Sequence, residues 1–313
     1  MQKKRLGKSD IEVAPIAFGG NVFGWTIDEK KSFEMLDAFM ASGFNFIDTA
    51  DTYPRWVPGN RGGGSETIIG KWLKWRNSRN KVIIATKVGG DMGEGRNLSK
   101  KYILKQVEDS LRRLQTDYID LYQTHHDDPT TPVEDTLSAY AQLIKEGKVR
   151  MIGASNLSKD RLTGSLETAI QNNLPVYQTL QPLYNLYERE KFETDYKGIC
   201  EKYGLSVLPY YSLASGFLSG KYRSDNDISK SLRGKGIKKK YINERGFKIL
   251  RALDKIAGEY QSQPATIAIA WLLSKSLVTA PVVSVTNTHQ LEEIIKATSI
   301  HLNNEAIEVL EEN

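Results

Sequence analysis

The chain has 313 residues, 40% hydrophobic and 26% charged, a composition that excludes fibrous, low-complexity and disordered classes. Its net charge of +5 is too small an excess to predict nucleic-acid binding. A single cysteine, Cys200, excludes an intramolecular disulfide, and the sequence shows neither a signal peptide nor an apolar run long enough to span a membrane. We therefore expect a cytoplasmic protein with no nucleic-acid or membrane partner.

Short apolar segments rich in Val, Ile, Tyr and Phe alternate along the chain with amphipathic segments of helical period. The predicted strands are residues 14–18, 44–48, 81–87, 118–125, 149–154, 175–179, 205–210 and 280–284. The predicted helices are residues 29–41, 66–75, a helix that begins after the N-cap Ser99, 132–145, 159–172, 189–203, 246–260 and 289–298. Eight such units without a break in composition predict an α/β protein, a (β/α)8 TIM barrel forming one domain over residues 1–313.

The glycine-rich segments do not fit a nucleotide-binding motif of another fold. Residues 19–24 and 62–64 lack the spacing of a dinucleotide-binding motif, and residues 216–222 are one residue short of a P-loop. No zinc-type spacing is present, and His125 and His126 should face opposite sides of a strand. We therefore expect no metal site.

Two predicted loops are longer than connectors need to be. Residues 52–65 and 220–245 exceed the usual length of barrel loops, which predicts a functional or mobile role. The lysine run 238–240 in the second loop is expected to be a solvated surface. Trp25 and Trp56 are candidates for the wall of a pocket, with plain packing as the alternative.

Polar residues follow the predicted strands at the end where barrel enzymes carry their catalytic groups. Asp48, Lys87 and His125 each close a strand, and Tyr53 lies five positions after Asp48. A lysine held protonated by Asp48 should lower the pKa of Tyr53 from about 10, which would make Tyr53 a general acid. His125 would polarise a substrate oxygen. The alternative is that Asp48 only caps a helix.

Five motifs, spread over nearly the whole chain, resemble those of the aldo-keto reductases. They are Asp48-Thr49-Ala50 with Tyr53, Asp120-Leu121-Tyr122-Gln123-Thr124-His125, Gly153-Ala154-Ser155-Asn156, Gln181-Pro182-Leu183-Tyr184-Asn185, and residues 210–222. The last is similar to the pyrophosphate loop of the bacterial and potassium-channel-β-subunit-like branch of that family. Their number and order make the resemblance specific.

The resemblance implies an NADP(H)-dependent oxidoreductase that reduces small aldehydes or ketones to alcohols by direct hydride transfer. Its catalytic tetrad would be Asp48, Tyr53, Lys87 and His125, with Tyr53 protonating the carbonyl oxygen. Ser155, Asn156 and Gln181 would hold the nicotinamide carboxamide, Tyr210 would stack on the ring, and the stretch 213–221 with Arg233 would clasp the pyrophosphate. The implied cofactor contacts are Gly20, Asn21, Asp48, Ser155, Asn156, Gln181, Tyr210, Ser212, Leu213, Ser215, Gly216, Leu218, Lys221, Arg233, Thr286, Gln290 and Glu293.

The sequence departs from the family where many members place cations on the cofactor's 2′-phosphate. Those positions hold Val283 and His289, so NADP(H) is expected with NAD(H) as the less favoured alternative. One other reading is a cofactor-sensing regulatory protein that resembles potassium-channel β subunits. Another is a barrel glycosidase, for which Asp127 and Asp128 are the nearest carboxylate partners of Asp48. The substrate, the favoured direction and the oligomeric state stay open.

Overall fold

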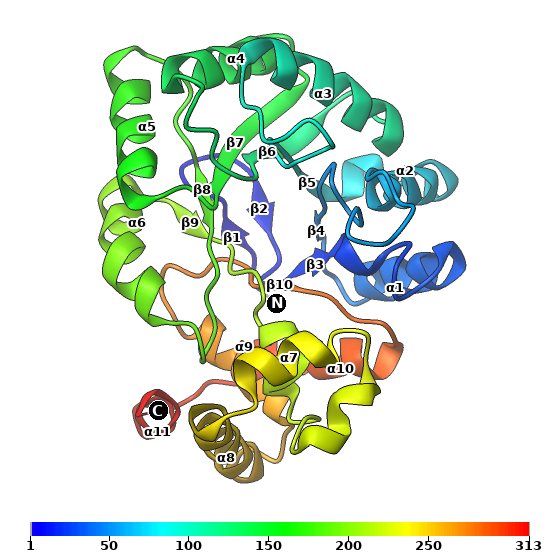
Figure 1. The fold of residues 1–313 in the computed structure, drawn as a ribbon, viewed down its shortest axis with the longest axis vertical. Helices are drawn as coiled ribbons and strands as arrows, with labels where there is room; N and C mark the ends of the chain where they lie inside the picture. The colour runs from blue at the N-terminus through cyan, green and yellow to red at the C-terminus, as the bar shows by residue number, and fades with distance from the viewer. Residues whose placement is uncertain (1, 313) are drawn as a thin grey trace.

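The computed structural model describes residues 2–312 and contains an eight-stranded parallel sheet that curls into a barrel (Figure 1). In spatial order the strands are β10 (Val282–Val283), β3 (Ala17–Gly19), β4 (Phe46–Asp48), β5 (Ile83–Val88), β6 (Ile119–Thr124), β7 (Val149–Ser155), β8 (Thr179–Gln181) and β9 (Ser206–Val207). The barrel closes where the amide of Thr279 donates to Val207 (3.0 Å) and that of Val282 donates to Pro209 (2.8 Å). This confirms the predicted (β/α)8 fold.

Helices surround the strands on the outside of the barrel (Figure 1). They are α1 (Glu29–Ala41), α2 (Gly64–Arg76), α3 (Lys100–Leu114), α4 (Val133–Lys145), α5 (Lys159–Gln171), α6 (Lys197–Tyr203), α7 (Gly234–Tyr241), α8 (Glu244–Glu259), α9 (Pro264–Leu273), α10 (Thr288–Lys296) and α11 (Asn304–Glu311). Ser99 caps α3 as predicted, since its hydroxyl accepts from the amide of Tyr102. Asp28 caps α1 in the same way.

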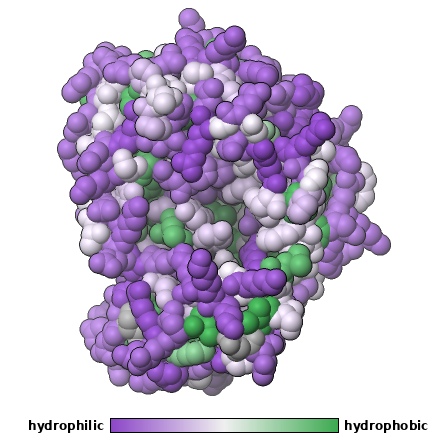
Figure 2. All heavy atoms as spheres, viewed as in Figure 1, coloured by the Kyte–Doolittle hydropathy of each residue, from purple (hydrophilic) through white to green (hydrophobic). Residues whose placement is uncertain are grey.

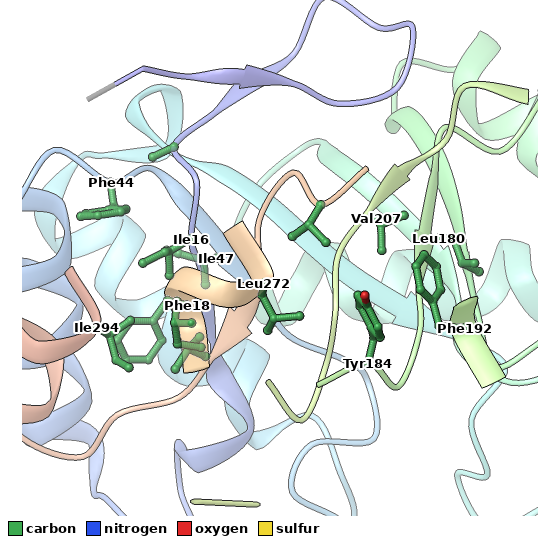
Figure 3. Packing of buried hydrophobic residues seen from close by; sticks show 14 of the residues in the cluster. Ile16, Phe18, Phe44, Ile47, Leu180, Tyr184, Phe192, Val207, Leu272 and Ile294 are labelled. Atoms are coloured by element: carbon green, nitrogen blue, oxygen red, sulfur yellow. The ribbon is translucent and has the colours of Figure 1, made fainter. Parts of the chain in front are cut away.

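The core has two parts because strand residues alternate between the inside and the outside of the barrel. Ala17 and Phe46 belong to the interior cluster, which the N-terminal hairpin of β1 (Lys4–Arg5) and β2 (Glu12–Val13) helps to fill. The alternate residues Phe18 and Ile47 pack in the larger cluster between strands and helices (Figure 3). With the interior filled by apolar side chains, the polar groups gather where the strands end.

Several elements differ from the sequence prediction. The strand predicted at 175–179 overlaps β8 at Thr179 only; Pro175 has no amide to donate to a ladder, and Gln178 already donates to Ile152 on β7 (2.9 Å). The loop 220–245 contains α7, and residues 192–196 form a π-helix before α6. The sequence prediction also missed the β1–β2 hairpin, α11, and α9, which is apolar on almost every side and so has no amphipathic period.

Candidate active site

A buried ion pair lies at the centre of the site. Lys87 on β5 and Asp48 at the end of β4 are 0% and 1% exposed, and Lys87 Nζ donates to Asp48 Oδ2 at 2.6 Å. The same ammonium donates to the backbone oxygen of Thr49 at 2.7 Å. Asp48 Oδ1 accepts from the side-chain amides of Gln181 (2.8 Å) and Gln123 (3.2 Å). The carboxylate is therefore held by three side chains from three strands.

Gln123 is a site residue that the sequence analysis missed. It lies opposite Lys87 in the β5–β6 register, two residues before His125 and on the same face of the strand as Leu121. The alternation of strand side chains could have singled it out, because a buried glutamine between an inward leucine and His125 must point into the barrel.

Tyr53 lies in the segment that follows β4, close to the Lys87–Asp48 ion pair. Its ring is partly buried, with Lys87 Nζ 5.0 Å from the ring centroid. The His125 ring lies 5.8 Å from it, edge to face. Burial raises the pKa of Tyr53, and this outweighs the lowering by the Lys87 charge. The predicted net lowering of this pKa is therefore wrong: the phenol stays protonated at neutral pH in the protein without cofactor.

His125 follows β6 and is 9% exposed, with its backbone amide bonded to Val88 (2.8 Å). Burial, the Lys87 charge, His126 and Arg96 lower its pKa well below 6.5, so the imidazole is neutral at pH 7. Its Nδ1 atom has no hydrogen-bond partner within residues 2–312. The prediction that His126 faces away is wrong, because β6 ends at Thr124 and the two imidazoles stack, with centroids 4.5 Å apart.

The structure thus brings Asp48, Tyr53, Lys87 and His125 together at one end of the barrel. A protonated phenol next to a buried cation and a neutral imidazole can donate a proton to an oxygen held between Tyr53 and His125. The glycosidase alternative needs a second carboxylate that works with Asp48, but both candidates bond to other groups. Asp127 pairs with Arg161 (3.0 Å), and Asp128 accepts from the backbone amide of Leu98 (3.0 Å). Neither bonds to Asp48.

The residues predicted to hold a nicotinamide form one hydrogen-bonded group beside the tetrad. Tyr210 donates its hydroxyl proton to Asn156 Oδ1 (2.9 Å), and Asn156 Nδ2 donates to the backbone oxygen of His125 (2.9 Å). Ser155 donates to the backbone oxygen of Gln181 (2.8 Å). Asn156 has φ of 51°, so it turns the chain out of β7. The group links the ends of β6, β7, β8 and β9.

The predicted pyrophosphate loop is a tight turn with three successive positive φ angles. They are 48° at Ala214, 60° at Ser215 and 98° at Gly216. Lys221 Nζ lies 3.5 Å from where a Cβ on Gly216 would be, so the ammonium covers this turn. Leu213 is partly buried and Leu218 is fully buried. The Ser212 hydroxyl is engaged, since it bonds to the backbone oxygens of Pro209 (3.0 Å) and Val282 (2.9 Å).

Arg233 reaches back from the start of α7 toward the barrel. Its guanidinium lies 4.9 Å from the ring centroid of Trp25, and it forms no ion pair with any residue of the described chain. Burial lowers its pKa, but an arginine stays charged at neutral pH. A partly buried cation without a counter-charge is suited to an anionic ligand.

The remaining predicted cofactor residues lie around β3, β10 and α10. Gly20 follows β3, and a Cβ there would meet Ser65 Oγ at 2.7 Å. Ser284 donates to Asn21 Oδ1 (2.6 Å). Gln290 Oε1 accepts from the amide (2.9 Å) and hydroxyl (3.1 Å) of Thr286. Glu293, 9% exposed, accepts from Lys296 (2.6 Å) and Thr266 (3.1 Å).

Asp51 is a second residue that the sequence analysis missed, and it is titratable. It is fully buried in the turn between Asp48 and Tyr53, and neither carboxyl oxygen has a partner in the described part of the chain. Burial and the charge of Glu66 raise its pKa well above 3.8. Glu66 itself is paired with Arg113 (2.6 Å). Asp51 therefore needs to be a neutral acid to remain buried.

We expect Asp51→Asn to become more stable relative to wild type as the pH rises. The unfolded wild-type chain loses the Asp51 proton near pH 3.9 while the folded chain keeps it, so wild-type stability falls by about 1.4 kcal/mol per pH unit between the two pKa values. Asp51→Asn has no carboxyl group at this position, so its stability does not fall in this way. Urea unfolding at pH 5, 6 and 7 measures it, with the exposed Asp160→Asn as control. A stability difference that is constant across these pH values would contradict a neutral Asp51.

The face of the molecule that carries α7 is hollowed at its centre (Figure 2). Both apolar and polar side chains are seen inside the hollow, and polar ones dominate its rim. Among residues 2–312 there is no cluster of three histidine, cysteine or acidic side chains that could hold a metal ion. No helix in that range is long and apolar enough to cross a membrane.

Known proteins of one family are similar to this chain. The model of the aldo/keto reductase family matches residues 15–313. The chain belongs to the aldo/keto reductase family. It is 33% identical over 318 residues to the "Uncharacterized oxidoreductase YrpG" of Bacillus subtilis (strain 168), covering 99% of this chain and 95% of that protein.

Two further relatives carry different names. The "Aldo-keto reductase YhdN" of Bacillus subtilis (strain 168) is 34% identical over 318 residues, with 97% of this chain and 91% of that protein covered. A "Probable voltage-gated potassium channel subunit beta" of Oryza sativa subsp. japonica is 32% identical over 310 residues, with 96% and 92% covered. The resemblance seen in the motifs is confirmed, and the chain is an oxidoreductase of a family that generally uses nicotinamide cofactors.

Proposed function

We propose that this aldo/keto reductase reduces aldehydes or ketones to alcohols with NADP(H), and that Tyr53 is the general acid. The observation that carries the proposal is the buried Lys87–Asp48 pair, which lies beneath Tyr53 and beside a neutral His125. A regulatory protein that only senses its cofactor has no need of this arrangement.

The residues of this chain bind the carbonyl oxygen and protonate it. His125 and Tyr53 orient the oxygen, because their rings lie edge to face at one end of the barrel. Tyr53 transfers its hydroxyl proton to the oxygen as negative charge develops there, and the Lys87 ammonium stabilises the resulting phenolate. Asp48 keeps Lys87 charged and in place. The alcohol would be completed by this proton together with the hydride that NADPH, when bound, would supply to the carbonyl carbon.

The side chains around the site fit a dinucleotide. Arg233 is a partly buried cation without a counter-charge, and Lys221 covers the turn at Gly216, so both are available to a pyrophosphate. Ser155, Asn156 and Gln181 offer amide and hydroxyl groups to a carboxamide beside the tetrad, and Tyr210 offers a ring. Thr286 and Gln290 would contact the 2′-phosphate.

We expect NADPH to bind more tightly than NADH, but only about tenfold to a hundredfold. Neutral hydrogen bonds contribute about half as much as charge-assisted ones, and a decade of affinity corresponds to about 1.4 kcal/mol. Gln290 directs its Oε1 at Thr286, which leaves its amide nitrogen as a neutral donor. Thr286→Ala combined with Gln290→Ala should nearly erase the preference. Fluorescence titration with both cofactors measures it.

Tighter binding of NADH than of NADPH by the wild-type protein would mean that the 2′-phosphate site is misplaced.

The proposed activity is tested by mixing the purified protein with NADPH and a panel of aromatic and aliphatic carbonyl compounds. The proposal predicts that NADPH absorbance falls and that the alcohol appears in equal amount. Binding of NADPH without turnover of any carbonyl compound would instead favour the cofactor-sensing alternative.

A further inference from the structure

The loop after β4 and the loop after β5 are joined by the ion pair of Arg55 and Asp91. Arg55, in the loop after β4, donates to the backbone oxygen of Asp91 in the loop after β5, and it lies 3.3 Å from Asp91 Oδ1. The same Oδ1 accepts from the backbone amides of Gly93 (2.7 Å) and Gly95 (3.0 Å). Asp91 thus closes a tight turn, and Arg96 is the next residue of that turn.

Arg96 is an exposed cation that forms no ion pair or hydrogen bond with the residues described, 2–312. The acids of the neighbouring loop are engaged elsewhere: Asp127 pairs with Arg161, and Asp128 accepts from Thr130 and Thr131. In the turn itself, Glu94 is exposed and is not paired with Arg96. The loop is therefore held in place by Arg55 while Arg96 remains without a counter-charge.

The loop that carries Arg96 lies against His125. A Cβ on Gly90, in the same loop, would lie 3.3 Å from His125 Nδ1, and a Cβ on Gly89 would meet the side chain of Leu98, two residues after Arg96. The Leu98 amide also donates to Asp128 (3.0 Å), in the segment that follows His125. Arg96 is therefore in a loop that borders the proposed site of the carbonyl oxygen, and its charge contributes to the lowered pKa of His125 and His126.

Aromatic rings lie beside Tyr53, and one of them belongs to Trp56, the residue after Arg55. Trp56 packs edge to face on Tyr53, with centroids 5.4 Å apart, and on Trp25 at 5.5 Å. Trp56 remains 47% exposed, although tryptophan is usually more deeply buried. Arg233 covers Trp25. An apolar, flat surface is thus open to a ligand directly beside the proposed acid.

We propose that the substrates of this protein are aromatic carbonyl compounds that carry an anionic group, with Arg96 binding the anion and Trp56 packing on the ring. This inference rests on the proposed function, and the reduction step is unchanged from that given above. Arg96 and Trp56 are specificity-determining residues in this proposal, and Tyr53 and His125 remain the groups at the carbonyl oxygen.

The test compares two aldehydes that share a ring and a reacting carbonyl but differ in charge, 4-carboxybenzaldehyde and methyl 4-formylbenzoate. We expect kcat/KM for the carboxylate to exceed that for the ester by about tenfold, as for one charge-assisted hydrogen bond. Arg96→Met should remove the difference and Arg96→Lys should restore part of it. The control is Arg251→Met, which replaces another exposed arginine on α8 and should change nothing.

A binding measurement gives a second readout that does not need turnover. The alcohol product 4-(hydroxymethyl)benzoate should quench tryptophan fluorescence at lower concentration than its methyl ester, and Arg96→Met should abolish this difference. Trp56→Leu should reduce the quenching itself.

The outcomes separate this inference from the proposed function. If both aldehydes are reduced by the wild-type protein with equal kcat/KM, the inference is overturned and the proposed function stands. If neither aldehyde nor any other carbonyl compound is reduced, the proposed function fails, and the binding comparison alone decides the inference. Equal quenching by product and ester would then overturn it.

Discussion

Replacing Tyr53 by Phe is expected to slow carbonyl reduction by about 10²–10⁴-fold, the usual contribution of general-acid catalysis. The variant loses the hydroxyl of the ring that lies beside both Lys87 and His125, while the ring keeps its contacts with Trp56 and His125. Because burial raises the pKa of Tyr53, the wild-type phenol carries its proton throughout the neutral range. Single-turnover oxidation of bound NADPH measures the loss.

The affinity for NADPH is the internal control for this variant. It should change little, since none of the proposed cofactor contacts involves the Tyr53 hydroxyl. A Tyr53→Phe protein that turns over near the wild-type rate would show that another group donates the proton. A protein that has lost both turnover and NADPH binding would show that the substitution has disturbed the barrel end rather than removed an acid.

Replacing Lys87 by Met is expected to destabilise the fold by about 3–5 kcal/mol, because removal of one partner of a buried ion pair leaves the other charge uncompensated. The remaining partner is Asp48, which would keep only the amides of Gln123 and Gln181. Asp48→Asn combined with Lys87→Met removes both charges and should recover much of the loss. Urea unfolding of the wild type, both single variants and the double variant measures the coupling.

The pH dependence of the same unfolding experiment has a definite sign. Burial lowers the pKa of Lys87, but the charges of Asp48 and Tyr53 raise it above 10.5 overall. The folded state then binds a proton that the unfolded state has lost, so the stabilisation is complete below pH 10.5 and decreases as the pH rises above it. Lys87→Met should lack this alkaline decrease. An unchanged alkaline unfolding profile would contradict a charged Lys87.

Lys87→Met should also lower carbonyl reduction by at least about 10²-fold, because the phenolate formed at Tyr53 loses its stabilising charge. Without that charge the pKa of Tyr53 rises further, so alcohol oxidation, which needs the phenolate, should shift to higher pH. A pH–rate profile identical to that of the wild type would show that Lys87 does not act on Tyr53.

The barrel could be predicted from the sequence because its strands and amphipathic helices alternate with clear periods. Helix 29–41 was predicted with the observed bounds because its apolar residues recur at helical spacing; in the structure Asp28 caps it. Helix α9 lacks such a period because Thr266 to Leu272 are buried all round. The β1–β2 hairpin consists of two-residue strands, which are too short for a periodic signal.

The positions of the site residues followed from the rule that barrel enzymes carry catalytic groups at strand ends, but their electrostatics did not. The pKa of Tyr53 depends on how deeply the ring is buried, and the sequence does not contain this information. The stacking of His125 and His126 depends on where β6 ends. Asp51 was missed because a buried carboxyl without a partner has no sequence pattern.

The loops that carry specificity were the least predictable part. The length of the loop 52–65 indicates that it is more than a connector. The sequence does not reveal the contact between Arg55 and Asp91, which holds two loops together. Arg233 was predicted as a site residue only from the family resemblance. The position of Arg233 over Trp25 depends on the path of the segment that leads into α7.

The central claim is that the residues around the Lys87–Asp48 pair promote direct hydride transfer from NADPH to a carbonyl carbon. The most direct test is to reduce an aromatic aldehyde with NADPH deuterated at the transferring position and to analyse the alcohol by mass spectrometry. The account predicts one deuterium on the carbinol carbon for each NADPH consumed by the wild-type protein, and almost none formed in the same time by Tyr53→Phe. Absence of alcohol, or alcohol without deuterium from either stereospecifically labelled cofactor, would contradict it.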